Sequence, residues 1–272
     1  MTAQHTATSA APAARIELQG MTKIYGTMRA NDNVSRSGAP GEIHAVLGEN
    51  GAGKSTLMKM IYGVTQPDAG KIIWDGQEVQ IKSPAQARAL GIGMVFQHFS
   101  LFETLTVVEN IALAMDEKTS MSALSERIKQ VSEHYGLPIA PQRLVHDLSV
   151  GERQRVEIVR CLLQNPKLLI MDEPTSVLTP QAVEKLFVTL RQLASEGCSI
   201  LYISHKLDEI QSLCDSATVL RHGAVSGECQ PKEETVETMA QLMIGRVLPQ
   251  YEHASHETGD IRLQINQLSM PT

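Results

Sequence analysis

The sequence has few cysteines, and their spacing indicates neither a metal site nor a disulfide framework. The four lie far apart, and no Cys-x-x-Cys pair occurs among Cys161, Cys198, Cys214 and Cys229. This spacing excludes the usual zinc-binding patterns, and a disulfide framework is not expected in a chain of 272 residues. A reduced cytosolic compartment is therefore the simplest interpretation.

Long hydrophobic runs and clusters of basic residues are also missing. No apolar run approaches the roughly 20 residues that cross a bilayer, so a role at a membrane would require docking onto other subunits. The net charge is −6 and the pI about 5.9, whereas nucleic-acid-binding proteins usually carry a basic patch. We therefore expect no nucleic-acid partner. Residues 1–14 lack the basic start and long apolar core of a secretion signal, and we expect a disordered lead.

A glycine-rich stretch is the strongest signal that is present. It fits the pattern G-x-x-x-x-G-K-[ST] and follows an apolar run, Ile43–Leu47, that is typical of a buried strand. The residues after it favour a helix. In order, the stretch consists of Gly48, Glu49, Asn50, Gly51, Ala52, Gly53, Lys54, Ser55 and Thr56. A strand, a glycine loop and a helix form the context of a phosphate-binding loop, and the alternative is a chance glycine-rich turn.

The chemistry of such a loop assigns a role to each of its polar residues. The glycines let successive backbone N–H groups point at one anion, and the helix N-terminus adds partial positive charge. Lys54 would neutralise the β- and γ-phosphates, and the Ser55 hydroxyl would ligate Mg²⁺. ATP with Mg²⁺ is the expected ligand.

A second apolar strand, Leu168–Met171, ends in two acidic residues, Asp172 and Glu173. Ligands of open α/β sheets bind beyond the carboxyl ends of the strands. Phosphoryl transfer needs a metal site and an oriented water molecule. We expect Asp172 to hold Mg²⁺ through water and Glu173 to orient or deprotonate the attacking water. The alternative is an acidic pair solvated at the surface.

Three further residues have positions that indicate a role in the site. His205 directly follows a strand and would contact the γ-phosphate, whereas we interpret the other eight histidines as surface residues. Gln97 also ends a strand and would reach the metal or the attacking water, its alternative being a satisfied polar cap. Tyr25 would stack on an adenine ring, its alternative being an ordinary core tyrosine.

Strands that alternate with helices predict a mainly parallel sheet with helices on both faces. A block of helices at about 98–164 interrupts the alternation and is interpreted as an inserted subdomain of a domain spanning 15–248. Asp75-Gly76 predicts a hairpin turn. Residues 249–260 resemble a linker, and 261–272 repeat the pattern of residues 15–22. We therefore expect a second, similar domain to start there, in a tandem protein or a truncated piece of one.

Taken together, these motifs resemble those of ATP-binding-cassette (ABC) transporter ATPase subunits over about residues 15–250. The resemblance implies a P-loop NTPase α/β core, an N-terminal antiparallel β subdomain and an inserted α-helical subdomain. The matching segments, in chain order, are Tyr25 for the aromatic loop, Gly48 to Thr56 for the phosphate loop, Gln97 for the glutamine loop, Leu148 to Glu152 for the family signature, Leu168 to Glu173 for the acidic strand and His205 for the switch histidine.

The resemblance also implies partners. Two cassettes would pair head to tail, as a homodimer or within one chain, so that Ser149 and Gly151 grip the γ-phosphate bound to the opposite cassette. The residues of these motifs are similar to those in the ATPases of bacterial importers for simple sugars and nucleosides, with the nucleoside branch closer. Such ATPases act at the cytoplasmic face of the inner membrane with membrane permease subunits and, indirectly, an extracytoplasmic solute-binding protein.

Three departures from the family pattern stand out. Val150 and Glu152 replace a glycine and a glutamine of the signature, and Val150 cannot easily adopt φ > 0. Thr179 stands where the family usually has aspartate, and residues 36–39 are less apolar than the strand expected there. Two other functions remain open at this point: a soluble tandem ATPase acting on ribosomes or DNA, and a nucleotide-binding regulatory module without turnover.

Overall fold

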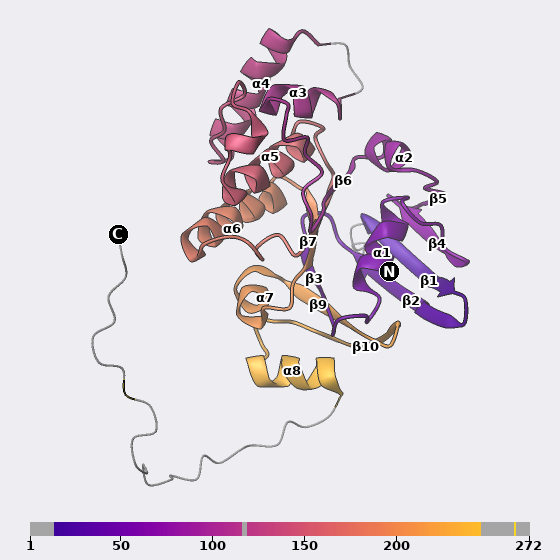
Figure 1. Ribbon diagram of the computed structural model, residues 1–272. Coiled ribbons are helices and arrows are strands. Elements are labelled where there is room, and N and C mark those ends of the chain that lie inside the picture. The colour runs from indigo at the N-terminus through magenta and orange to yellow at the C-terminus, as the bar shows by residue number, and fades with distance from the viewer. Residues whose placement is uncertain (1–13, 116–118, 246–263, 265–272) are drawn as a thin grey trace, which may run out of the picture.

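The computed structural model describes residues 14–115, 119–245 and 264, which form two β-sheets and a set of helices (Figure 1). The elements in chain order are β1 (Ile16–Tyr25), β2 (Met28–Gly38), β3 (Ile43–Leu47), α1 (Lys54–Ile61), β4 (Ala69–Trp74), β5 (Gln77–Val79), α2 (Pro84–Ala89), β6 (Ile92–Val95), α3 (Val107–Ala112), α4 (Met121–His134), the 3-10 turn η1 (Val145–Asp147), α5 (Val150–Leu162), β7 (Leu168–Asp172), α6 (Pro180–Ser195), β8 (Ser199–Ile203), α7 (Leu207–Leu213), β9 (Ser216–Arg221), β10 (Ala224–Cys229) and α8 (Val236–Ile244).

A six-stranded sheet forms the centre of the fold, in the order β10-β9-β3-β8-β7-β6. Strands β9, β3, β8, β7 and β6 run parallel, and β10 pairs with β9 in the antiparallel sense. Parallel strands buried on both faces consist of nearly continuous apolar runs, which is why Leu168–Met171 has no polar alternation. The predicted parallel sheet is confirmed.

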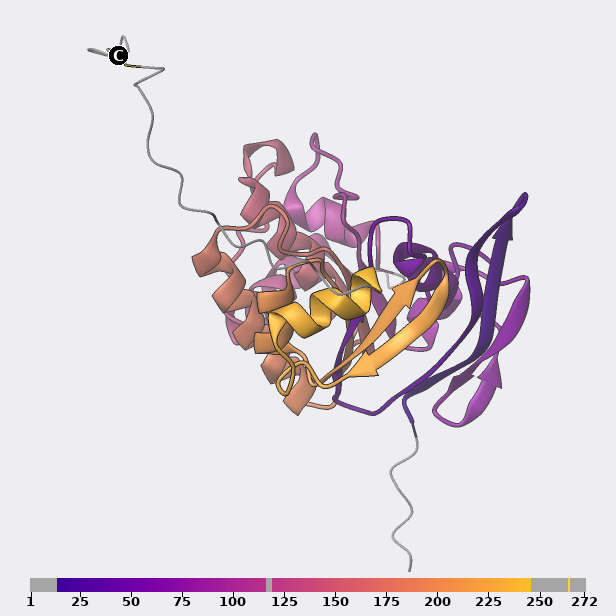
Figure 2. The ribbon, with the colours of Figure 1, turned by 90° about the horizontal axis from the view of Figure 1, so that it is seen from below.

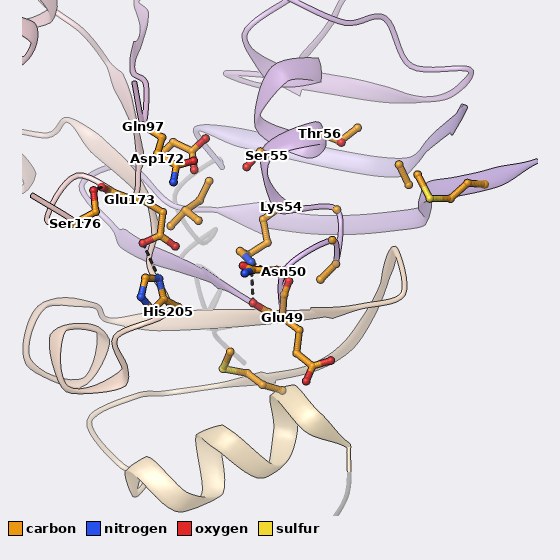
Figure 3. A pocket seen from close by; sticks show the side chains of 18 of the residues that line it. Glu49, Asn50, Lys54, Ser55, Thr56, Gln97, Asp172, Glu173, Ser176 and His205 are labelled. Atoms are coloured by element: carbon orange, nitrogen blue, oxygen red, sulfur yellow. Dashed lines mark hydrogen bonds and ion pairs between the residues drawn. The ribbon is translucent and has the colours of Figure 1, made fainter. Parts of the chain in front are cut away.

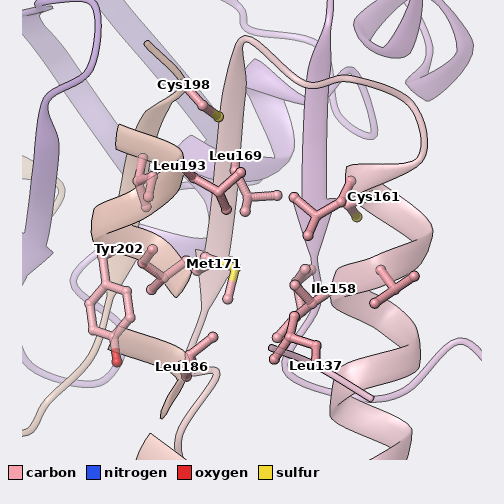
Figure 4. Close-up of a cluster of buried hydrophobic side chains, with 14 of the residues drawn as sticks. Leu137, Ile158, Cys161, Leu169, Met171, Leu186, Leu193, Cys198 and Tyr202 are labelled. Carbon is pink, nitrogen blue, oxygen red and sulfur yellow. The ribbon is translucent and has the colours of Figure 1, made fainter. Parts of the chain in front are cut away.

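The side chains of β7 alternate between two hydrophobic cores on the two faces of this sheet. Leu169 and Met171 join the core that packs against α5 and α6, as Figure 4 shows. Leu168 and Ile170 point the other way, into the core shared with α1 and the N-terminal strands. The two cores fix the height and direction of β7, and with them the position of the acidic residues at its end.

The second sheet is antiparallel, in the order β2-β1-β4-β5, and lies beside α1 on one side of the central sheet (Figures 1 and 2). Its β4–β5 hairpin turns at Asp75 (φ 47°) and Gly76 (φ 81°), with Trp74 paired to Gln77. Two central residues with positive φ form the type I′ turn that Asp-Gly favours. The antiparallel subdomain expected from the family resemblance is confirmed.

Helices α3, α4 and α5 lie between β6 and β7 in the chain and pack on the side of the central sheet opposite α1 (Figure 1). Capping boxes start two of them, with Thr106 and Glu109 at α3 and Ser149 and Glu152 at α5. Side-chain caps of this type satisfy the free backbone N–H groups of a first helical turn. In the part of the chain that the structure describes, no helix combines the length and apolar character needed to cross a membrane.

The interpretation of His44 as a surface residue is wrong. Its ring lies buried between β3 and β9, with Nδ1 2.6 Å from the Ser216 hydroxyl and Nε2 2.9 Å from the Thr218 hydroxyl.

The polar character of residues 36–39 is explained by a buried charge that has a partner. Arg36 ends up buried in β2, with its guanidinium 3.7 Å from the Glu42 carboxylate. Charged and polar groups replace apolar ones here because they pair with each other.

Several elements differ from expectation. The sequence analysis does not predict β9, β10, α7 or α8. The expected lead at 1–14 lies almost entirely outside the described residues. The expected linker at 249–260 and second domain start at 261–272 also lie outside them, apart from residue 264.

Candidate functional site

A pocket of about 690 Å³ lies where the carboxyl ends of β3, β6, β7 and β8 meet the N-terminus of α1 (Figure 3). It brings together the whole predicted loop from Gly48 to Thr56 with Tyr25, Gln97, Asp172, Glu173 and His205. Of the predicted site residues, only Ser149 and Gly151 are not part of its lining. Parallel strands collect their carboxyl ends at one edge of a sheet, which explains why residues so distant in sequence converge.

The glycine loop has a backbone shape that side chains would prevent. Gly48 (φ 146°) and Gly53 (φ 102°) adopt positive φ, and a Cβ there would lie 2.3 Å from the Leu220 carbonyl oxygen or 2.2 Å from that of Ala30. Gly53 is followed directly by α1, so the unpaired N–H groups of the first helical turn face the pocket. The loop therefore forms a cradle of N–H groups for an anion.

Lys54 lies buried beneath this loop, in the first turn of α1. Its Nζ donates hydrogen bonds to the carbonyl oxygens of Gly48 (2.7 Å) and Glu49 (3.0 Å). Burial lowers the pKa of Lys54, and the negative charges of Glu173 and Asp172 oppose that shift. The ammonium group is thus already held at the loop, at the point where phosphate oxygens would give it stronger partners.

Asp172 is a buried carboxylate at the end of β7, and its Oδ1 has no hydrogen-bond donor among the described residues. Burial raises the pKa of Asp172, and a hydrogen bond from Ser55 opposes this. An unpartnered buried carboxylate oxygen needs a compensating group, and Mg²⁺ prefers oxygen ligands. Asp172 and Ser55 therefore fit the metal that the sequence predicted.

The described residues contain no group of three or more His, Cys, Asp or Glu side chains placed to hold a metal ion. Mg²⁺ usually takes few protein ligands and keeps water and substrate phosphate oxygens in its shell. Gln97, two residues beyond β6, lies in the same pocket and offers a further oxygen.

Glu173 and His205 form the second polar pair of the site. Nδ1 of His205 lies 2.9 Å from Oε2 of Glu173, although the two are not aligned as a hydrogen bond, and Oε2 has no donor among the described residues. Glu173 also has φ of 51°, while its N–H donates to the Ile203 carbonyl oxygen. A positive φ outside glycine costs about 1–3 kcal/mol and is concentrated at functional sites. The backbone thus holds Glu173 in the lining of the pocket.

Tyr25 lies at the end of β1 and is 46% exposed, so the alternative of a core tyrosine is wrong. The Lys23 ammonium lies 5.5 Å from the centroid of its ring. An exposed aromatic ring at the edge of a phosphate-binding pocket offers a surface on which a base can stack.

The signature residues Ser149 and Gly151 lie at the N-terminus of α5, away from this pocket. The Ser149 hydroxyl donates to the Glu152 carboxylate (2.9 Å), and the Glu152 N–H donates back to it. Val150 is the first residue of the helix and does not adopt positive φ, so its side chain causes no backbone strain. Thr179 caps α6 in the same manner, accepting a bond from the Ala182 N–H.

Five lining residues were missed by the sequence analysis. Met28 and Ala30 come from β2, Ser176 from the loop after β7, Ile203 from the end of β8, and Met243 from α8. Ser176 and Ile203 lie close in the chain to Glu173 and His205, which is the signal that could have found them. Pairing of β2 with β1 brings Met28 and Ala30 to the pocket and packing of α8 brings Met243, and no pattern along the chain could have identified these three.

A family model described as ABC transporter matches residues 31–176. Among curated proteins, a nucleoside import ATP-binding protein NupA of Lactococcus lactis is 41% identical, covering 94% of this chain and 51% of the relative. A ribose import ATP-binding protein RbsA of Clostridium perfringens is 38% identical (93% and 52%), and a guanosine import ATP-binding protein NupO of Bacillus subtilis is 43% identical (85% and 46%). The chain thus spans about half the length of these relatives.

Solved structures give the same result. The ADP conformation of MJ1267, an ATP-binding cassette of an ABC transporter, has a TM-score of 0.75 at 26% identity, covering 86% of this chain and 99% of that one. A dimeric bacterial ABC transporter cassette, MJ0796, has a TM-score of 0.71 at 27% identity, covering 79% and 98%.

Proposed function

The chain belongs to the ABC transporter family, and from that premise we propose that it binds ATP with Mg²⁺ and hydrolyses the ATP to drive import of a small solute. The observation that carries the proposal is the convergence of Lys54, Asp172, Glu173 and His205 on one pocket. A module that only bound nucleotide would not need a positioned carboxylate beyond the metal site.

Binding rests on the loop and on α1. The N–H groups after Gly48 would hold the phosphates, Lys54 would exchange its two carbonyl partners for phosphate oxygens, and Tyr25 would stack on the adenine. Ser55, Asp172 and Gln97 would hold Mg²⁺, which supplies charge neutralisation at the phosphates when it is bound.

Hydrolysis rests on Glu173 and His205. Glu173 orients a water molecule and takes its proton as the water oxygen bonds to the γ-phosphorus. The bond between the γ-phosphorus and the oxygen that bridges it to the β-phosphate breaks, giving ADP and inorganic phosphate. His205, 2.9 Å from Glu173, contacts the γ-phosphate. It loses this contact when the phosphate leaves.

A second cassette would complete the site. Ser149 and Gly151 lie at the start of α5 and do not line the pocket of their own chain. Their N–H groups suit the γ-phosphate of a facing cassette. The partner is a second copy or the other half of a tandem chain. The half-length match to the curated relatives supports the tandem arrangement.

Import is supported by the names of the relatives, which are ATP-binding proteins for nucleosides, guanosine and ribose. The partners would be membrane permease subunits and, indirectly, an extracytoplasmic solute-binding protein, with this chain peripheral at the cytoplasmic face of the bacterial inner membrane. Phe102 and Leu113 on the helical block beyond Gln97 are 60% and 64% exposed. We propose that permease subunits cover these two side chains.

Uptake in cells tests the import proposal. Cells that depend on the full-length protein are compared with cells carrying Glu173→Gln, using labelled nucleosides and simple sugars as solutes. We expect the variant to lose uptake of one of these classes. Unchanged uptake of all solutes, together with sedimentation of the protein with ribosomes, would instead favour the soluble tandem ATPase, which no feature of the described structure favours.

A further inference from the structure

Glu209, on the short helix α7, has a carboxylate that the steps above do not use. Its side chain is 12% exposed, and both of its oxygens are occupied. Oε2 accepts hydrogen bonds from the hydroxyls of Thr175 (2.7 Å), Tyr202 (3.0 Å) and Ser204 (3.5 Å). Oε1 lies 3.0 Å from the Lys206 ammonium. Four donors from three segments of the chain therefore converge on one carboxylate.

These donors flank the two residues assigned to hydrolysis. Thr175 lies two positions after Glu173, in the loop that follows β7. Ser204 and Lys206 lie immediately before and after His205, in the loop that follows β8. Lys206 also donates to the Thr175 backbone carbonyl oxygen (3.1 Å). The contacts of Lys206 and Glu209 with Thr175 thus connect the segment that follows β8 to the loop that follows β7.

The network is largely shielded from water. Thr175, Tyr202 and Ser204 are fully buried, and Tyr202 packs with its ring against Phe187 in the core. Burial and the nearby Glu209 carboxylate raise the pKa of Tyr202, so its hydroxyl keeps its proton and donates to Glu209. Hydrogen bonds of this type in a buried setting are stronger and more geometrically defined than exposed ones.

Glu173 has a strained backbone, and the Glu209 network holds the segment that follows it. A positive φ at a non-glycine residue persists only where surrounding contacts hold it, and Thr175, bonded through its side chain and its carbonyl, anchors the segment directly after it. We propose that Glu209 is a positioning residue for hydrolysis, which with Lys206 and Thr175 fixes the spacing between Glu173 and His205. This inference rests on the proposed function and deepens it, because the same pocket is concerned.

The test compares Glu209→Gln with Asp208→Asn in the full-length protein. Asp208 is the adjacent, exposed acidic residue in the first turn of the same helix, so its substitution removes an equal charge without touching the network. We expect Glu209→Gln to lower kcat by at least about tenfold, since a misplaced catalytic group loses rate steeply. The KM for ATP should stay within about twofold, because Glu209 does not line the pocket. Asp208→Asn should change neither constant.

A second pair of variants guards against a folding defect in Glu209→Gln. Thr175→Val removes the hydroxyl and should lower kcat. Thr175→Ser keeps the hydroxyl and should keep kcat at the wild-type value. Combined with Glu209→Gln, Thr175→Val should cost less than the sum of the two single effects, because the two residues share one contact.

Three results would overturn the inference. If kcat per folded molecule is normal in Glu209→Gln while Glu173→Gln abolishes turnover, the inference fails and the proposed function stands. A proportional change of kcat and KM that follows a lowered Tm would mean that the network only holds the fold together. If the wild-type protein binds no ATP in an equilibrium titration, the proposed function fails and the inference fails with it.

Discussion

Ser149 and Glu152 hydrogen-bond each other reciprocally across the first turn of α5. The Glu152 carboxylate accepts from the backbone N–H of Ser149 at 2.8 Å and from its hydroxyl at 2.9 Å, while Ser149 Oγ accepts from the Glu152 N–H at 3.3 Å. Arg143 adds an ion pair to Glu152 at 2.6 Å. The family's usual glutamine at this position can form the same capping box, so the replacement by Glu152 adds the ion pair without losing the cap.

Two substitutions of Glu152 should therefore separate the contribution of the cap to stability from that of the ion pair. Glu152→Ala loses both and should cost about 1 kcal/mol, which corresponds to a fall in Tm of about 2–4 °C for a domain of this size. Glu152→Gln keeps the capping oxygen and should cost only a few tenths of that, since exposed ion pairs contribute little. Thermal unfolding of both variants measures this, and equal losses would show that the box does not stabilise α5.

Lys54→Ala should weaken nucleotide binding itself. The variant loses charge-assisted bonds to phosphate, each worth about 1.5–3 kcal/mol, so ATP affinity should fall by about tenfold or more. An equilibrium titration with ATP measures this. The matched control is Lys71→Ala, which removes an exposed ammonium paired with Glu78 on the antiparallel sheet. Equal affinity in the two variants would exclude Lys54 from phosphate binding.

Asp172→Asn should make hydrolysis depend on higher Mg²⁺ concentrations. The carboxylate supplies a charged oxygen for the metal, and the amide supplies only a neutral one. Chelation of Mg²⁺ should stop turnover of the wild type altogether. Without nucleotide, the variant should unfold at the same temperature or higher, because it removes a buried carboxylate oxygen that lacks a donor. An unchanged Mg²⁺ dependence of the ATPase rate would contradict the metal assignment.

His44 should make the fold sensitive to mild acid. Burial lowers the pKa of His44 to about 4 in the folded protein, whereas in the unfolded chain the ring titrates near 6.5. Between these values the unfolded chain binds a proton that the folded protein does not, so stability rises with pH across the window. As the pH falls from about 6.5 towards 4, unfolding free energy should decrease by up to about 1.4 kcal/mol per unit.

Urea titrations at several pH values between 4 and 7 test this dependence. His44→Gln should flatten it, while substitution of the exposed His98 by glutamine should leave it as it is. If the wild type and His44→Gln lose stability in parallel, another group controls acid sensitivity. Glu42 is not that group: hydrogen bonds with His44 and Ser216 hold its pKa down to about 2 against the effect of burial, so its contribution is lost mainly below this pH range.

Much of the site could be predicted because its signals are local. The phosphate loop requires glycines at Gly48 and Gly53 whatever the rest of the chain does, and Asp172 ends an apolar run that is typical of a buried parallel strand. Helix caps such as Thr106 and Ser149 are equally local, since each bonds a residue three positions further along the chain. Parallel strand ends then predict that these residues meet.

What the sequence could not show depends on pairing over long distances. His44 is buried because β9 brings Ser216 and Thr218 beside it from about 170 positions away. Met243 reaches the pocket only through the packing of α8, and Glu209 meets Thr175 only after two strands have aligned. No period or motif along the chain encodes these contacts, since each depends on which strands become neighbours.

The most direct test of the account is to measure ATP binding and ATP hydrolysis side by side in Glu173→Gln, with a second cassette present either as a second copy or in the same chain. The variant keeps the loop, Lys54 and the metal residues, so its ATP affinity should match that of the wild type. Turnover should fall by about 10²- to 10⁴-fold, because the group that takes the proton of water is lost, and ATP-bound cassette pairs should accumulate. Wild-type turnover in this variant would contradict the account, because Glu173 would then have no part in cleaving the γ-phosphate.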